Sequence, residues 1–304
     1  MLSLPALRLL HELRLRGTLT GAAEALFISR SAASHQLAVV QRAVGVPLTE
    51  KVGRGLRLTE TGAELALRAE RVLRELEEAE AAVERGRGTP SGTVRVGVVQ
   101  TIAVRILAGV LTDLRRDHPQ LRVEAHGRTT EDAVAAVRSA ESDLAVVPSY
   151  GRSPLLVPAG LHREHLFHDP VRLAVAAGHP LAHRSGAVRM AELAGERWIA
   201  GDRRGYFGRL VPDLCREGGF EPDIVHRSTD FTVVAALVGA GHGVALIPAS
   251  ADLHRWPGVR TAAIDAEGAG REVVALVREG STERPGVHAV VRAFHRHSPA
   301  AGTG

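Results

Sequence analysis

The first side chains in the sequence that could do chemistry form a short polar edge between residues 30 and 35. They come soon after the alanine-rich stretch GAAEAL, and their spacing fits one side of a helix: Arg30, Ser31, Ser34 and His35. Arginine and short polar side chains form hydrogen bonds with base edges in the major groove of DNA. The edge therefore predicts a helix that reads DNA.

Three helices are expected to position this edge. Residues 4–15 and 21–26 have apolar residues at helical spacing, and Ser29 is a suitable N-cap for a third helix that ends at Gly45. The third helix has an apolar stripe opposite the polar edge: Ala33, Leu37, Val40 and Val44. This pattern is typical of a helix-turn-helix, in which the second motif helix enters the major groove. A helical bundle with polar outer faces is the alternative.

Residues 48–59 follow as a glycine-centred reversal between two short extended pieces. We expect a β-hairpin wing in which Arg54 and Arg57 contact phosphates or the minor groove. Residues 1–62 contain eight basic and four acidic side chains, so the whole formal excess of +4 lies in this part of the chain. Such a charge favours a polyanionic partner, although a surplus on a solvated face is the other interpretation.

One long helix is predicted over residues 61–85. Its apolar seam is spaced as in a coiled coil and covers about three heptads: Leu65, Ala69, Val72, Leu76, Ala79 and Val83. If the seam pairs between chains, the protein is a dimer whose two-fold symmetry predicts a partly palindromic DNA target. Docking of the seam on its own domain is the alternative. The stretch 86–92, GRGTPSG, then serves as a linker.

Beyond the linker, predicted strands alternate with predicted helices, which indicates βαβ units in a mainly parallel sheet. We expect strands at 93–99, 121–127, 143–148, 164–176, 197–201, 223–228, 243–248 and 272–277, and helices at 102–117, 130–140, 206–217, 230–240 and 286–297. These units predict two α/β lobes joined by connections near 149–163 and 255–271. The expected organisation is a winged helix-turn-helix domain at 1–60, a linker or dimerisation helix and hinge at 61–92, and a two-lobed region at 93–304, with lobe I at 93–149 and 271–304 and lobe II at 163–255.

A small-molecule site is expected in the cleft between these lobes. Ligands bind at the carboxyl ends of strands in such sheets, and polar residues stand there in this sequence: Gln100, Thr101, Ser149, Asp202 and Thr229.

The sequence gives little support for metal binding, thiol chemistry or catalysis. His162, His165 and His168 lie in a loop and strand that would point the last two to opposite faces, so we expect no metal site. Cys215 is the only cysteine and is expected to be a buried packing thiol. No nucleophile, zinc-protease or dinucleotide motif is present, so we expect neither an enzyme nor a cofactor.

The sequence also resembles the LysR-type transcriptional regulators along nearly its whole length. The stretches that carry the resemblance are LTGAAEALFISRSAASHQLAVVQRAVGVPLTEKVGRGLRLTETG, GTVRVGVV, LFHDPVRLAVAAGHPLA, CREGGFEPDI and LVGAGHGVALIP. The resemblance implies a winged helix-turn-helix head and a two-lobed, periplasmic-binding-protein-like effector domain in a homodimer or homotetramer. It also implies that Gln36 helps to position the third helix and that Gln100 and Thr101 form the effector-contact turn. The chain departs from the family pattern at three places: Val40-Gln41, Thr49 and Lys51.

The resulting expectation is a cytoplasmic, sequence-specific DNA-binding regulator that senses a small molecule. No apolar run approaches the roughly 18 residues of a membrane span. Two alternatives are a cytoplasmic small-ligand-binding protein and an α/β enzyme with an appended DNA-binding head. The basic head and the lack of a signal peptide argue against a secreted solute-binding protein.

Overall fold

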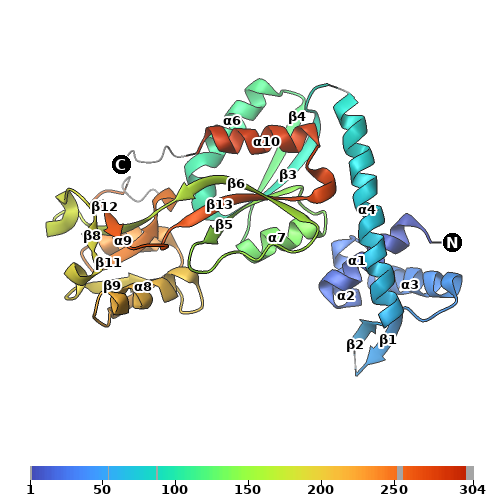
Figure 1. Cartoon of the computed structure of the whole chain (residues 1–304), viewed down its shortest axis with the longest axis horizontal. Helices are drawn as coiled ribbons and strands as arrows, with labels where there is room; N and C mark the ends of the chain where they lie inside the picture. The colour runs from blue at the N-terminus through green and yellow to red at the C-terminus, as the bar shows by residue number, and fades with distance from the viewer. Residues whose placement is uncertain (1, 54, 87, 252–255, 299–304) are drawn as a thin grey trace.

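A small helical head opens the chain (Figure 1). The computed structural model describes residues 2–53, 55–86, 88–251 and 256–298. The head consists of α1 (Leu4–Arg16), α2 (Leu19–Ala25), α3 (Arg30–Val44) and the antiparallel hairpin of β1 (Thr49–Val52) and β2 (Gly55–Leu58). Its core is made mainly of leucine and alanine, and small alanine side chains let the helices approach closely.

The third helix begins and ends where the sequence predicts. The Ser29 hydroxyl accepts a hydrogen bond of 3.1 Å from the Ala32 amide, and Gly45 ends the helix in the left-handed conformation at φ 75°. Ala33 and Leu37 of the predicted stripe are buried, as is Val40 one turn further on. The helix therefore packs its apolar side into the head.

The long helix α4 (Glu60–Gly86) leaves the head as one 27-residue element. The Thr59 hydroxyl caps it by accepting a 3.0 Å hydrogen bond from the Gly62 amide. Its seam has two environments: Ala69 is buried beside the head, whereas Val72 and Val83 are about half or more exposed, at 49% and 64%. Val72, Ala79 and Val83 of the seam are thus accessible to a partner helix, whereas Leu76 is half-buried.

Lobe I is built on a sheet with strand order β4-β3-β5-β13-β6. Its strands are β3 (Gly92–Val98), β4 (Leu121–Gly127), β5 (Leu144–Tyr150), β6 (Leu161–Asp169) and β13 (Arg271–Arg278). Helices α6 (Ala108–Asp117) and α10 (Pro285–Arg296) cover one face and α7 (Thr130–Arg138) covers the other (Figure 1). A short α5 (Gln100–Ile102) and a π-helical turn at Ala103–Leu107 connect β3 to α6.

Lobe II has the strand order β10-β9-β11-β7-β12-β8. Its strands are β7 (Val171–Ala176), β8 (Val188–Arg189), β9 (Arg197–Ala200), β10 (Asp223–Arg227), β11 (Val244–Pro248) and β12 (Val259–Asp265). Helix α8 (Tyr206–Glu217) packs on one face and α9 (Phe231–Gly239) on the other. Short 3-10 turns follow β7, β8 and β11. In the parts of the chain that the structure describes, each helix is too short or too polar to cross a lipid bilayer.

Two expectations about the lobes were wrong. Strand β6 was assigned to lobe II, but it pairs with β13 in the lobe I sheet, and the chain crosses to lobe II only at Pro170. Strand β12 was taken as part of a connection, but it pairs with β7 in the lobe II sheet. In lobe I, β13 runs antiparallel to β5 and β6, and in lobe II, β7 runs antiparallel to β11 and β12, so each sheet is mixed instead of mainly parallel.

Candidate DNA-reading surface and interlobe site

The polar edge of α3 faces outward from the head. Arg30, Ser34 and His35 are exposed, and so is Ser31, whose hydroxyl lies 2.9 Å from that of the capping Ser29. Gln36 is half-buried at the margin of the same edge. The opposite side of the helix is in the core, so this edge is the part of α3 that a DNA groove could receive.

The side chain of Gln41 ties this helix to the wing. Its Oε1 accepts hydrogen bonds from the Leu48 amide at 2.9 Å, the Thr49 amide at 3.0 Å and the Thr49 hydroxyl at 3.1 Å. Gln41 and Thr49 both depart from the family pattern, and the structure pairs them with each other. The sequence interpretation missed this contact because the two residues belong to different elements.

The described part of the wing carries exposed basic side chains. Arg57 donates a 2.7 Å hydrogen bond to Glu50 on the neighbouring strand, and its side chain is 72% exposed. Lys51 on β1 is exposed as well. Arg54, the other predicted wing arginine, lies outside the described residues. An ion pair this exposed contributes little stability, so Arg57 can exchange Glu50 for a phosphate.

A buried polar network joins the two lobes around Arg271. Its Nε donates 2.8 Å to Asp169, and its Nη2 donates 2.8 Å to the Ser250 hydroxyl and 2.9 Å to the Thr101 hydroxyl. Arg271 and Asp169 are 2% and 1% exposed. Asp169 also accepts the Ser250 hydroxyl at 2.7 Å, so the two charges are paired and hydrogen-bonded. The network holds the turn after β3 in lobe I against the end of β11 in lobe II.

Aromatic rings fill the space beside this network. Tyr150 at the end of β5 stacks on Tyr206 at the start of α8, and the edges of Phe207 and Phe231 continue the cluster. The Tyr206 hydroxyl donates a 2.8 Å hydrogen bond to the Ala269 carbonyl, and burial raises the pKa of this phenol to about 12. The chain has two tyrosines, and both lie here.

The five predicted effector residues have different environments. Thr101 is in the interlobe network, and Gln100 is exposed beside it. Ser149 is buried, and its hydroxyl accepts a 3.1 Å hydrogen bond from the Leu155 amide, so it holds a loop and does not face a cleft. Asp202 and Thr229 are exposed where β9 and β10 end.

The sequence interpretation missed Tyr150, Tyr206 and Arg271. The only local signal for Arg271 was its place among the charged residues that flank the apolar run of β13, since Arg271 and Glu272 precede that run and Arg278 ends it. The clustering of the two tyrosines could not be seen, since they are 56 positions apart along the chain and meet only when the lobes close.

Comparison with known proteins decides the family. The model of the LysR substrate binding domain matches residues 87–299, and that of the bacterial regulatory helix-turn-helix protein, lysR family, matches residues 4–63. The chain belongs to the LysR family of bacterial regulators. It is a DNA-binding transcriptional regulator whose C-terminal two-lobed domain senses a small molecule. As a LysR-family regulator it is homo-oligomeric and binds double-stranded DNA.

Relatives of this LysR-family regulator are distant but cover most of it. The hydrogen peroxide-inducible genes activator of Pectobacterium carotovorum is 27% identical over 75% of this chain and 74% of its own length. The transcriptional dual regulator GltC of Bacillus subtilis is 25% identical over 72% of each. Two structures share the fold: full-length OxyR of Pseudomonas aeruginosa (TM-score 0.71, 19% identity, 100% and 99% coverage) and full-length CbnR with its target DNA (TM-score 0.56, 22% identity, 98% and 100% coverage).

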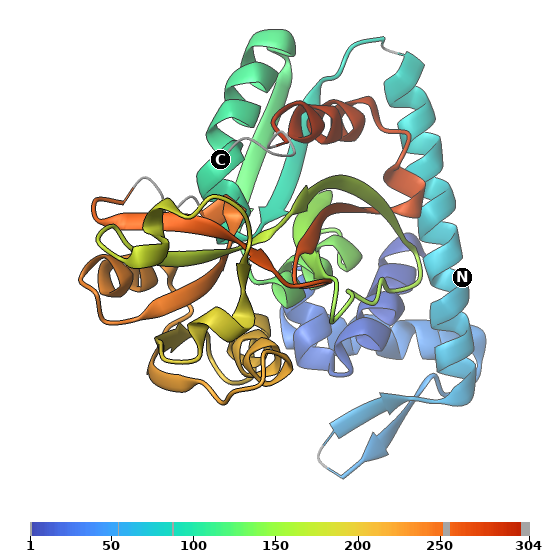
Figure 2. The same ribbon diagram turned by 60° about the vertical axis from the view of Figure 1, so that its left-hand side comes forward.

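The linker helix of this regulator is fastened to lobe I. Glu77 of α4 accepts a 2.6 Å hydrogen bond from Arg278 and a weaker one from the Ser281 hydroxyl. One and two turns from Glu77, Arg74 and Glu84 also form ion pairs with lobe I. Figure 2 shows α4 running beside lobe I, next to the chain that enters α10. These contacts join lobe I to the helix that carries the head.

The head itself also contacts lobe I. His11 of α1 is half-buried, and its Nε2 lies 3.5 Å from the Arg138 carbonyl at the end of α7. Burial lowers the pKa of His11, an effect that the Arg138 carbonyl and Glu70 only partly offset. A protonated His11 is therefore disfavoured in this contact.

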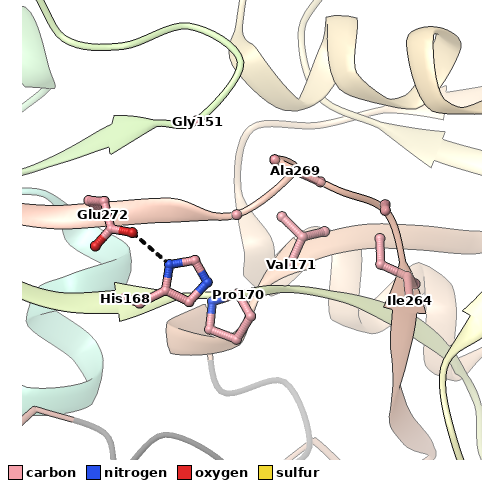
Figure 3. Close-up of a pocket in the computed structure, with 10 residues that line it drawn as sticks. Gly151, His168, Pro170, Val171, Ile264, Ala269 and Glu272 are labelled. Atoms are coloured by element: carbon pink, nitrogen blue, oxygen red, sulfur yellow. Dashed lines mark hydrogen bonds and ion pairs between the residues drawn. The ribbon is translucent and has the colours of Figure 1, made fainter.

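A small cavity lies at the hinge, where the chain passes from β6 to β7 and from β12 to β13 (Figure 3). Its volume is about 270 Å³, and Figure 3 shows the His168–Glu272 pair with Pro170 beside it, and Val171 and Ile264 farther along. The cavity and the Arg271 side chain lie on opposite faces of β13. Glu272 lines the cavity, and Arg271 and Glu272 point to opposite faces because they are successive residues of a strand.

The expectation for the histidines of β6 was wrong in one respect. His165 and His168 both bind Glu272, so they lie on the same face. A β-bulge at Leu166 inserts an extra residue, so that Leu166 and Phe167 are both buried and the alternation is reset. Burial tends to raise the pKa of Glu272, but hydrogen bonds from His168 and His165 lower it below its usual value. Among the described residues, no group of His, Cys, Asp and Glu has the geometry to hold a metal ion.

Cys215 is buried in α8, as predicted. Burial, assisted by the negative charge of Glu221, raises the pKa of its thiol to about 12. At neutral pH this cysteine is a packing side chain and not a thiolate.

Proposed function

We propose that α3 reads its operator with Arg30, Ser31, Ser34 and His35, while Gln36 positions the helix. The single observation that supports this assignment is the division of α3 into a buried apolar side and an exposed polar edge. The basic excess of the head supplies attraction to phosphates, and the short side chains supply hydrogen bonds to bases.

Arg57, and Arg54 in the sequence beside it, are proposed to contact the DNA backbone from the wing. The exposed part of the α4 seam, around Val72 and Val83, is proposed to pair between two chains. A two-fold pair of heads matches a partly palindromic operator. The organisation is then a head at 1–60, a linker helix with hinge at 61–92 and a two-lobed region from 93 onward.

The effector is proposed to bind between the lobes, next to Thr101 and Gln100, with Asp202 and Thr229 at the margin of lobe II. Ser149 supports the site only by holding the loop after β5. An effector there would compete with Arg271 for the Thr101 hydroxyl and with Tyr206 for the face of Tyr150. Binding would thus be coupled to the angle between the lobes.

Relatives are named as hydrogen peroxide-inducible activators, yet we propose that this chain senses its effector by reversible binding. Cys215 is buried and protonated at neutral pH, and with one cysteine in the chain no intrachain disulfide can form. We also propose that the protein is not an enzyme and acts in the cytoplasm, where bacterial DNA is found. The regulatory role of its relatives supports both proposals.

A gel shift with the DNA upstream of its own gene tests this function. The full chain is titrated at two salt concentrations against that fragment and against a scrambled fragment of equal length. We expect preferential binding to the upstream fragment, with an affinity that falls steeply as salt rises because phosphate contacts release counterions. Equal affinity for both fragments at both salt concentrations would reject sequence-specific reading.

A further inference from the structure

We propose that lobe II has a second small-molecule site, distinct from the interlobe site, that binds a phosphate monoester of a small polyol. The site is an open pocket of about 420 Å³ on the outer side of α8, called here the arginine pocket. Its lining consists of four arginines, one aspartate and two residues without polar side chains: Arg203, Arg209, Arg216, Arg227, Asp213, Gly208 and Pro212.

The fold of α8 explains why the arginines gather. The helix buries Leu210, Val211 and Leu214 against the sheet, so positions 209, 213 and 216, spaced at i, i+4 and i+7, form its outer face. Arg203 precedes the helix, and Arg227 ends the neighbouring strand β10. Three separate segments thus place guanidinium groups around one hollow.

The charges of the pocket are only partly neutralised. Arg216 forms ion pairs with Asp213 and Glu221, and Arg227 donates a 3.0 Å hydrogen bond to the Gly201 carbonyl. Among the residues that the structure describes, the guanidinium groups of Arg203 and Arg209 have no hydrogen-bond or ion-pair partner. Guanidinium groups with free donors bind phosphate oxygens in pairs of parallel hydrogen bonds, which makes a phosphate the best-matched anion.

Pro212 gives the same pocket a hydrogen-bond acceptor. It lies inside α8, and because proline has no N–H, the Gly208 carbonyl four residues earlier lacks its helical donor. Position 208 has no room for a side chain, since a Cβ there would lie 1.7 Å from the Asp202 carbonyl oxygen. A free acceptor beside free guanidinium groups suits a ligand that carries a hydroxyl as well as a phosphate.

The arginine pocket does not depend on the interlobe site. It contains neither Thr101 nor Arg271, and its ligand chemistry differs from that of the aromatic cluster. The proposal can therefore fail or succeed whatever the result of the DNA-binding experiment.

Calorimetric titration of the full chain without DNA tests the proposal, with glucose 6-phosphate, inorganic phosphate and glucose as probes. We expect glucose 6-phosphate to bind most tightly and glucose not to bind. The double variant Arg203→Ala/Arg209→Ala should lose at least about tenfold in affinity for both phosphate-containing probes. Arg189→Ala, which removes a 73% exposed arginine of lobe II outside the pocket, is the matched control and should bind like the wild type.

Pro212→Ala tests the acceptor separately. It restores an amide that can bond the Gly208 carbonyl, so we expect the preference for glucose 6-phosphate over inorganic phosphate to vanish while phosphate binding persists. Unchanged probe affinity in the double arginine variant would overturn the proposal. So would a loss of DNA affinity in that variant with no phosphate binding by the wild type, because the arginines would then contact DNA. Thermal unfolding of each variant verifies that it is folded.

Discussion

Tyr150 and Tyr206 stack face to face across the two lobes, with ring centroids 3.7 Å apart and planes inclined by 17°. One ring ends a strand of lobe I and the other begins a helix of lobe II, so the stack exists only while the lobes are close. The ion pair of Arg152 with Glu217 crosses the same gap. The closed arrangement of the lobes is therefore stabilised by the chain's own side chains.

Replacing one ring of this stack should weaken the contact between the two lobes. Aromatic pairs contribute about 0.5–1.5 kcal/mol beyond the burial of their area. We expect Tyr206→Leu, which keeps an apolar side chain, to lower the free energy of unfolding by about that amount relative to Tyr206→Phe, which keeps the ring. Denaturant unfolding of the full-length variants measures the difference, and equal stabilities would show that the stack contributes nothing.

Loss of the Arg271 guanidinium should lower the free energy of unfolding much more than loss of the tyrosine stack. Arg271→Met leaves Asp169 buried without its cation, and removing one partner of a buried pair costs about 3–5 kcal/mol. Adding Asp169→Asn to that variant should recover part of the loss, since the stranded charge is gone. The exposed pair of Arg68 and Glu64 is the control, where Arg68→Ala should change the unfolding midpoint little.

The two kinds of arginine in the head should behave differently toward DNA. We expect Arg30→Ala to reduce discrimination between operator and scrambled DNA by about 1–3 kcal/mol, because a base contact is lost. His35→Ala should have the same kind of effect. Arg57→Ala should weaken binding to both sequences alike and reduce the salt slope by about 1. If Arg30→Ala kept full selectivity in gel shifts, α3 would not read bases through this residue.

The carboxamide of Gln41 should stabilise the joint between α3 and the wing. Gln41→Leu leaves the Leu48 and Thr49 amides without their acceptor, which costs about 1–3 kcal/mol for each donor that stays buried. Gln41→Glu keeps an acceptor oxygen, and it restores the residue type of the family pattern, so its unfolding midpoint should stay near that of the wild type. A leucine variant as stable as the glutamate variant would contradict this role.

Acid should destabilise the docking of the head through His11. Its folded-state pKa is lowered by burial, so the unfolded chain binds a proton more readily, and stability falls as pH drops below the unfolded value of about 6.5. We expect the loss between pH 7 and pH 5 to be smaller in His11→Gln than in the wild type. Thermal unfolding at several pH values measures it, and parallel pH profiles would exclude His11 as the cause.

The helices of the head could be predicted from the sequence because several local signals mark the same helix boundaries. For α3, the Ser29 cap, the apolar stripe and Gly45 all mark the same boundaries, and the structure confirms them. Local signals were weaker for β12, whose interior positions include Ala262 and Ala263, small residues that give little apolar alternation. Its assignment to a connection was therefore wrong.

The interlobe contacts could not be predicted from local patterns. Arg271 and Thr101 are hydrogen-bonded although 170 positions separate them in the chain. The bulge at Leu166 changes which faces the histidines of β6 occupy, and a strand pattern read with strict alternation cannot include it. The proposed reading and effector residues stay predictions until the variants are measured.

The contact of Glu77 with Arg278 attaches α4 to lobe I, and the part of α4 before Glu77 extends from this attachment to the head. From that anchor to the start of the helix at Glu60 there are 17 residues, or about 25 Å of rigid rod at 1.5 Å per residue. A tilt of lobe I by about 8° would swing the far end of this rod by roughly 3–4 Å, close to the 3.4 Å rise of one base pair. If lobe I tilted by this amount and released the contact of His11 with Arg138, the head would move by about one base-pair step.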